Sequence, residues 1–124
     1  MSSDSVQLCL SRKTGEMLHR LRANRPLVHC ITNEVVQEFT ANVLLAAGAS
    51  PAMVVGEGEA EYFAGIASAL SVNVGTPYEA RIETMKKAIR GALAAGKPWV
   101  LDPVAAGGIP WRDKVIFELL EMQP

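Results

Sequence analysis

The residues of this chain that could do chemistry are polar or small, and each group of them follows an apolar run. Asp102 comes directly after the run Trp99–Leu101, and a loop of small residues, Ala105–Gly108, follows it. Asn33 lies just beyond the run Leu27–Ile31 in the same way. In open α/β sheets, ligands bind at the carboxyl ends of parallel strands. We therefore expect one site there, suited to a small, partly apolar ligand held by backbone groups, amides and one firm acid.

Each candidate residue also has a purely structural interpretation. Asp102 before Pro103 suits a turn, and Asn33 and Thr76 both suit helix N-caps. Met53 lies in an apolar run, where methionine usually fills the core. The residue pattern by itself leaves both interpretations open.

Other motifs exclude some classes of site. The chain has no P-loop and no His/Cys spacing typical of zinc, and the segment Gly56–Glu61 lacks the third glycine of a dinucleotide-binding loop. His29 and Cys30 lie inside an apolar run. We expect a core histidine and a buried, unreactive thiol there rather than a catalytic pair.

Apolar runs alternate with helical patterns along the chain, and these elements must position the candidate site. We expect strands over residues 27–31, 51–55, 69–74 and 99–101, and helices over residues 14–24, 34–47, 56–67, 77–95 and 110–121. Connections of this length join parallel strands by right-handed crossovers. The sequence therefore predicts an α/β protein with a mostly parallel sheet between helices, preceded by a loose arm over residues 1–10.

Two details of the expected helices are specific. Thr76, Pro77 and Glu79 have the spacing of a capping box with proline at the first helical position. Phe39 and Val43 share a helical stripe with Val35, Val36 and Ala47, which predicts one apolar face.

The composition bounds the class of protein. The 124 residues suit about one domain, and 49% hydrophobic with 20% charged residues is typical of a globular protein. A net charge of −1 without charged blocks gives no indication of a nucleic-acid or membrane-surface partner. No apolar run reaches the ~20 residues of a membrane span, and no secretory signal is evident. We therefore expect a cytoplasmic protein with two free thiols.

Several segments, taken in order and at similar spacing, resemble hydroxyethylthiazole kinase, the thiazole-salvage enzyme of thiamine biosynthesis. The matching segments are Val28–Asn33, Val35–Gln37, Phe39–Asn42, Leu44–Leu45, Gly48–Met53, Asn73–Thr76 and Leu101–Val104. Any one of them is a weak signal, but together they are specific. They extend over nearly the whole chain, and residues 1–10 contribute least.

The resemblance implies a ribokinase-like, three-layer α/β fold. It also implies transfer of the ATP γ-phosphate, with Mg²⁺, to the primary alcohol of 4-methyl-5-(2-hydroxyethyl)thiazole, and a homotrimer with sites between subunits. By position it implies a role for Asp102 beside Mg²⁺ and the phosphates. The positions it implies for substrate binding are Met53, Asn33, Val35, Gly75 and Thr76.

The family's Arg-Gly-Asn segment, a later ATP-binding threonine and a glycine-rich anion hole would follow Pro124. We therefore expect residues 1–124 to be the N-terminal, substrate-side part of a single kinase domain, with about four βα units. Its catalytic residues would lie beyond Pro124, and this part would have little turnover. Two alternatives stay open: a non-catalytic module that binds a small heterocycle, and another ribokinase-like kinase for vitamin alcohols.

Overall fold

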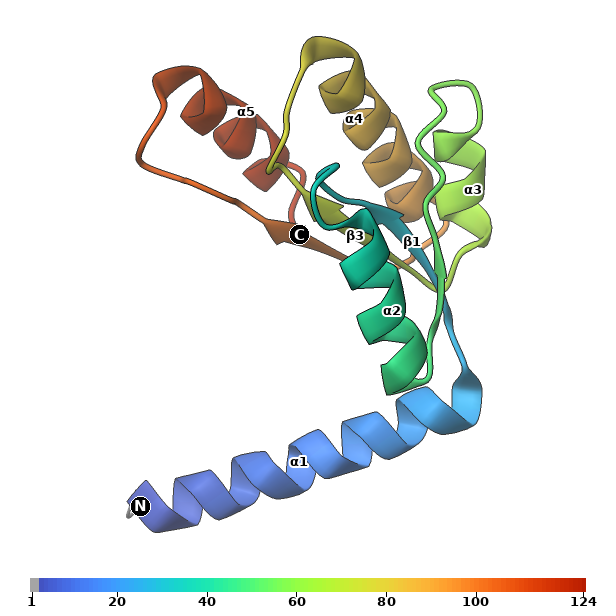
Figure 1. Ribbon diagram of the computed structural model, residues 1–124, viewed down its shortest axis with the longest axis vertical. Helices are drawn as coiled ribbons and strands as arrows, with labels where there is room; N and C mark the ends of the chain where they lie inside the picture. Colours follow the sequence, from blue (N-terminus) through green and yellow to red (C-terminus); the bar gives the residue numbers. More distant parts are fainter. Residues whose placement is uncertain (1–2) are drawn as a thin grey trace.

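Four parallel strands form the sheet on which the described chain, residues 3–124, is built in this computed structural model (Figure 1). The strands are β1 (Leu27–Ile31), β2 (Ser50–Ala52), β3 (Ala69–Asn73) and β4 (Trp99–Asp102). Their order in the sheet is β2-β1-β3-β4, and every neighbouring pair is parallel. The expected α/β class and parallel sheet are confirmed.

Helices cover the two faces of this sheet unequally. The helices are α1 (Ser3–Asn24), α2 (Gln37–Ala47), α3 (Ala60–Ile66), α4 (Glu79–Ala94) and α5 (Pro110–Leu120). The chain moves one way from β1 to β2 and the other way from β2 through β3 to β4, so right-handed crossovers place α2 on the opposite face from α3 and α4 (Figure 1). Helix α5, which follows β4, packs beside α4. Within residues 3–124, no helix is long and apolar enough to cross a lipid bilayer.

The core lies between the sheet and the layer of α3, α4 and α5. Ile31, Leu70 and Val72 of the sheet are buried there, together with Met85 and Ile89 of α4. These α4 residues are spaced at one helical turn, so they lie on a single stripe of the helix that faces the core, and β3 is the strand that α4 contacts most. The strands are therefore held mainly from one side.

Helix α2 contributes little to that core. It has no buried residue, and Phe39 and Val43 are 69% and 49% exposed. The apolar stripe that helical spacing predicts is therefore largely uncovered at these side chains. Helical spacing identifies an apolar face but not whether anything covers it, and here α2 packs mainly against the short edge strand β2.

The loose arm expected over residues 1–10 is also wrong where the structure describes it, because the chain is helical from Ser3. Residues 1–2 lie outside the described residues. Helix α1 projects away from the sheet (Figure 1), and its Met17 is 69% exposed. Local contacts support it instead of a core: Arg12 and Glu16 form an i,i+4 ion pair at 3.7 Å, and Thr14 Oγ1 donates to the carbonyl of Leu10 at 2.9 Å.

Candidate functional site

The carboxyl ends of β1, β3 and β4 lie side by side, and the polar residues gather there. Asn73 and Asp102 are the last residues of β3 and β4 and face each other in register. Asn33 follows β1 by two residues. Because the chain leaves β1 toward β2 and leaves β3 toward β4, the crevice between β1 and β3 is a topological switch point, the usual ligand site of open α/β sheets.

Hydrogen bonds connect these three side chains into one row, which we call the amide relay (Asn33, Asn73 and Asp102). Asn33 Nδ2 donates to Asn73 Oδ1 at 2.9 Å, and Asn73 Nδ2 donates to Asp102 Oδ2 at 2.8 Å. The backbone N–H of Gly75 also donates to Asn73 Oδ1, at 2.9 Å. The relay therefore links the loop after β1 to the acid at the end of β4.

The neighbours of the relay determine which way each amide points. A carboxylate only accepts and a backbone N–H only donates, so Asn73 must present its nitrogen to Asp102 and its oxygen to Gly75. Asn33 Oδ1 accepts from the N–H groups of Val35 and Val36 at 3.1 and 3.2 Å. The Asn33 nitrogen therefore donates to Asn73. The donors and acceptors of the relay run in one direction, from Asn33 through Asn73 to Asp102.

Asn33 is not the helix N-cap that its structural interpretation predicted, because the N-cap residue of α2 is Val36; it caps the preceding turn and also belongs to the relay. The turn it caps delays the helix, because α2 begins at Gln37 and not at residue 34. Gly75 packs directly against it: a Cβ at residue 75 would lie 2.7 Å from Asn33 Cβ. A side chain at residue 75 would therefore displace Asn33 from the relay.

Thr76 does not form the predicted capping box. Helix α4 begins at Glu79, and its N-cap residue, Tyr78, makes no side-chain cap hydrogen bond. Thr76 Oγ1 instead accepts from the backbone N–H of Glu34 at 3.1 Å. Its hydroxyl joins the loop after β3 to the loop after β1, a contact that local spacing could not indicate.

The sequence pattern missed Arg81, whose side chain is only 4% exposed. Its Nη2 donates to the carbonyl oxygen of Thr32 at 2.6 Å, and its Nη1 donates to Glu34 Oε1 at 3.1 Å. The one available signal was its place in the first turn of a helix, where the helix dipole disfavours a cation.

Met53 and Val35 lie at the same edge of the sheet but outside the relay. Met53 is half-buried and follows β2, on the far side of β1 from Asn73. Val35 is 84% exposed on the turn after β1. The structure therefore links Asn33, Gly75 and Asp102 through Asn73 and bonds Thr76 to Glu34. Met53 and Val35 lie at the same edge of the sheet, and neither side chain takes part in these bonds.

His29 is a core residue, as expected, and it holds the segment beside Met53. It is fully buried, and its Nε2 donates to the carbonyl oxygen of Val54 at 2.7 Å. Its ring packs against that of Phe63 in a T-shaped arrangement, with the ring centroids 5.1 Å apart. Burial lowers the pKa of His29, opposed by the Val54 hydrogen bond and by the charge of Glu59. The imidazole is therefore a neutral anchor for this loop.

Comparison with known proteins identifies the family. Residues 18–124 match the sequence model of the hydroxyethylthiazole kinase family. The chain belongs to this family. A hydroxyethylthiazole kinase of Klebsiella pneumoniae subsp. pneumoniae is 59% identical over 110 residues, which are 89% of this chain and 43% of that protein. The one from Cronobacter sakazakii is 54% identical over 124 residues, covering 100% of this chain and 46% of that protein.

A solved structure of a hydroxyethylthiazole kinase protein from Pyrococcus horikoshii OT3 has the same fold. It superposes with a TM-score of 0.83 at 48% identity, covering 86% of this chain and 42% of that one. The ribokinase-like expectation, which the resemblance to the hydroxyethylthiazole kinase family carried, agrees with this likeness. The chain spans less than half the length of these relatives.

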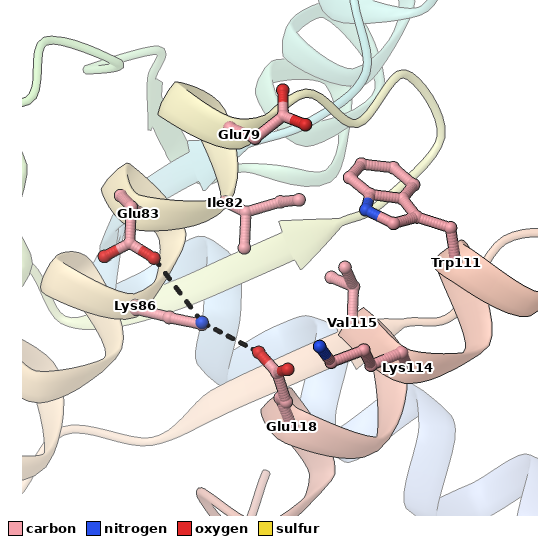
Figure 2. A pocket seen from close by; sticks show the side chains of 8 residues that line it. All are labelled: Glu79, Ile82, Glu83, Lys86, Trp111, Lys114, Val115 and Glu118. Atoms are coloured by element: carbon pink, nitrogen blue, oxygen red, sulfur yellow. Dashed lines mark hydrogen bonds and ion pairs between the residues drawn. The ribbon is translucent and has the colours of Figure 1, made fainter.

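A hollow of about 180 Å³ lies between α4 and α5, away from the relay (Figure 2). Within it, Lys86 Nζ contacts Glu118 Oε2 at 2.8 Å and Glu83 Oε1 at 3.4 Å. The hydrogen bond that Lys86 donates to Glu118 raises the pKa of Lys86, and the same bond lowers the pKa of Glu118. Because no residue of the relay lines it, we interpret this hollow as a groove between two packed helices of the family fold.

Proposed function

We propose that this chain forms the substrate-side part of an ATP-dependent kinase for the primary hydroxyl of 4-methyl-5-(2-hydroxyethyl)thiazole. The observation that carries the proposal is the amide relay at the switch point of the sheet. It connects Asn33 and Gly75, which the family resemblance assigns to the thiazole pocket, with Asp102, which it assigns to the phosphates.

The contacts of the relay indicate how the pocket would hold a thiazole. Both polar atoms of the Asn33 amide are already bonded within the protein, so Asn33 shapes the pocket and does not need to bond the ligand. The exposed Val35 and the half-buried Met53 offer apolar surface to a thiazole ring. The hydroxyethyl group would then extend along the row of strand ends toward Asp102.

Asp102 fits a Mg²⁺ ion that is held mainly by nucleotide phosphates. Its carboxylate is exposed and is oriented by the Asn73 amide through one oxygen. Among the described residues, no group of three His, Cys, Asp or Glu side chains could hold a metal. Mg²⁺ commonly takes one or two carboxylates together with phosphates and water. Bound there with ATP, it would neutralise charge that develops during phosphoryl transfer.

We further propose that turnover needs groups outside residues 1–124. Phosphoryl transfer depends on positioning and charge stabilisation, and the chain matches only 43% and 46% of its two bacterial relatives. We extend the family resemblance to a cytoplasmic homotrimer with sites between subunits. The apolar residues exposed on α2, such as Phe39, are surface that such an assembly could cover.

Titration calorimetry of the purified chain with the thiazole alcohol tests the proposal. Saturable binding that is lost when Gly75 is replaced by valine supports it, because that side chain would enter the space of Asn33. A matched control is Gly58→Val, since nothing lies within 4 Å of a Cβ at Gly58. If the chain binds a pyrimidine or pyridine alcohol more tightly than the thiazole alcohol, the protein is part of a kinase for another vitamin alcohol.

An activity assay with Mg²⁺ and ATP tests the second part. We expect the chain to form no thiazole phosphate above background. Turnover by the 124-residue chain would contradict the statement that catalytic groups lie outside it. Turnover that appears only when the remaining half of a relative is added would separate a kinase part from a non-catalytic binding module.

A further inference from the structure

Arg81 occupies a costly position, because it is a buried cation in the first turn of α4. The N-terminal end of a helix carries a partial positive charge, which repels a guanidinium. A buried charge also loses its hydration and must regain it from protein groups. An arginine at this position does not stabilise α4 itself, so the reason for it must lie in the contacts that the Arg81 side chain makes.

The guanidinium binds the residues on both sides of Asn33 of the amide relay. One nitrogen donates to the carbonyl of Thr32, and another donates to the carboxylate of Glu34, at 2.6 and 3.1 Å. These are the two residues on either side of Asn33. The planar fork of arginine can make both contacts at once, whereas the single ammonium of lysine cannot. Tyr78 completes the enclosure, with its ring centroid 5.7 Å from the Arg81 Cζ.

Another hydrogen bond fixes the loop after β1. The backbone N–H of Glu34 donates to Thr76 Oγ1, so Glu34 is held through both its side chain and its main chain. Thr76 adjoins Gly75, where a residue without a side chain leaves the space that Asn33 occupies. The loops after β1 and β3 are thereby fixed relative to each other.

We propose that Arg81 is a positioning residue for the ligand pocket. It fixes Thr32 and Glu34, and through them it keeps the Asn33 amide aligned with Asn73. It acts through these residues and touches neither the relay nor the reacting atoms. The inference rests on the proposed function for the identity of the ligand, but its consequence for loop order can be measured without any ligand.

Amide hydrogen exchange followed by NMR on the 124-residue chain tests this. In Arg81→Met, we expect the N–H groups of the two loops to exchange about tenfold faster or more, as expected for loss of charged hydrogen bonds. These N–H groups belong to Glu34, Val35, Val36 and Gly75. The N–H groups between β1 and β3 should change no more than in Lys86→Met, which removes a cation from the same helix away from the loops.

Two further variants keep the test decisive if Arg81→Met folds poorly. Glu34→Gln changes an exposed side chain and should accelerate the same loop amides to a smaller extent. Arg81→Lys keeps the charge and should restore loop protection only in part. Equal acceleration in the loops and in the β1–β3 ladder would mean that Arg81 serves overall stability and would overturn the proposal, as would loops unchanged in both Arg81→Met and Glu34→Gln.

Titration with 4-methyl-5-(2-hydroxyethyl)thiazole separates this inference from the proposed function. If the unchanged chain binds the alcohol, Arg81→Lys should weaken that binding about tenfold, while Lys86→Met should leave it unaltered. If Arg81→Lys binds the thiazole alcohol as tightly as the unchanged chain does, Arg81 does not position the ligand pocket. If the unchanged chain binds no alcohol while the loop amides respond as expected, the proposed ligand is wrong and the positioning role of Arg81 stands.

Discussion

Replacing Asn73 by alanine should destabilise the protein more than any other single truncation in the amide relay, because Asn73 is its central residue. The change removes the hydrogen bond from Asn33 Nδ2, the one from the Gly75 N–H and the one to Asp102 Oδ2. Asn73 is half-buried, so the groups near Asn33 are not fully rehydrated when it is lost. The loss is therefore concentrated at the β1–β3 crevice.

The magnitude follows from the three contacts. A neutral hydrogen bond contributes a net ~0.5–1.5 kcal/mol, and the bond to the exposed Asp102 counts near the lower end because water can replace it. We expect the free energy of unfolding to fall by about 2–3 kcal/mol for Asn73→Ala. For a chain of this size that corresponds to a melting temperature lower by roughly 8–12 °C.

Asn73→Asp separates the two sides of the relay. It keeps an acceptor for Asn33 and Gly75 but turns a second carboxylate toward Asp102, so like charges replace a hydrogen bond. At pH 7 we expect it to be destabilised as well. Acidification, which protonates one of two facing carboxylates, should recover part of the loss relative to the unchanged chain.

Chemical denaturation followed by circular dichroism measures these effects. Ser71→Ala, in the same strand, is the control and should change stability by less than about 0.5 kcal/mol. An Asn73→Ala variant as stable as Ser71→Ala would refute the reasoning. So would an Asn73→Asp variant that matches the unchanged chain at pH 7.

Further predictions concern the core. Burial lowers the pKa of His29 below 6.5, so the unfolded chain binds this proton more readily than the folded chain, and stability should fall as the pH drops below about 6.5. This dependence of the denaturation midpoint on pH should be lost in His29→Gln. Gly91→Ala should cost about 3 kcal/mol, because its Cβ would overlap a carbonyl of α3, whereas Gly15→Ala should leave thermal unfolding unchanged or raise it slightly. Burial raises the pKa of Cys30 to about 11, so a thiol reagent should modify Cys9 first and Cys30 only on unfolding.

The sequence by itself determined the elements and the edge of the sheet on which the site lies. Apolar runs with turn signals identify strands because local period and length are properties of neighbouring residues. Since parallel strands present all their carboxyl ends at one edge, Asn33, Gly75, Thr76 and Asp102 could be placed together before their contacts were known. The family resemblance added their expected roles.

Only the tertiary structure decided which of these residues touch. The order β2-β1-β3-β4 makes β1 and β3 neighbours, and this adjacency alone aligns Asn33 with Asn73 across 40 residues of sequence. Arg81 reaches Thr32 across 49 residues, and Thr76 bonds Glu34 instead of capping its own helix. Local spacing carries no information about strand order. Partners that the sheet brings together, and faces such as that of α2 that it leaves exposed, therefore appear only in the folded chain.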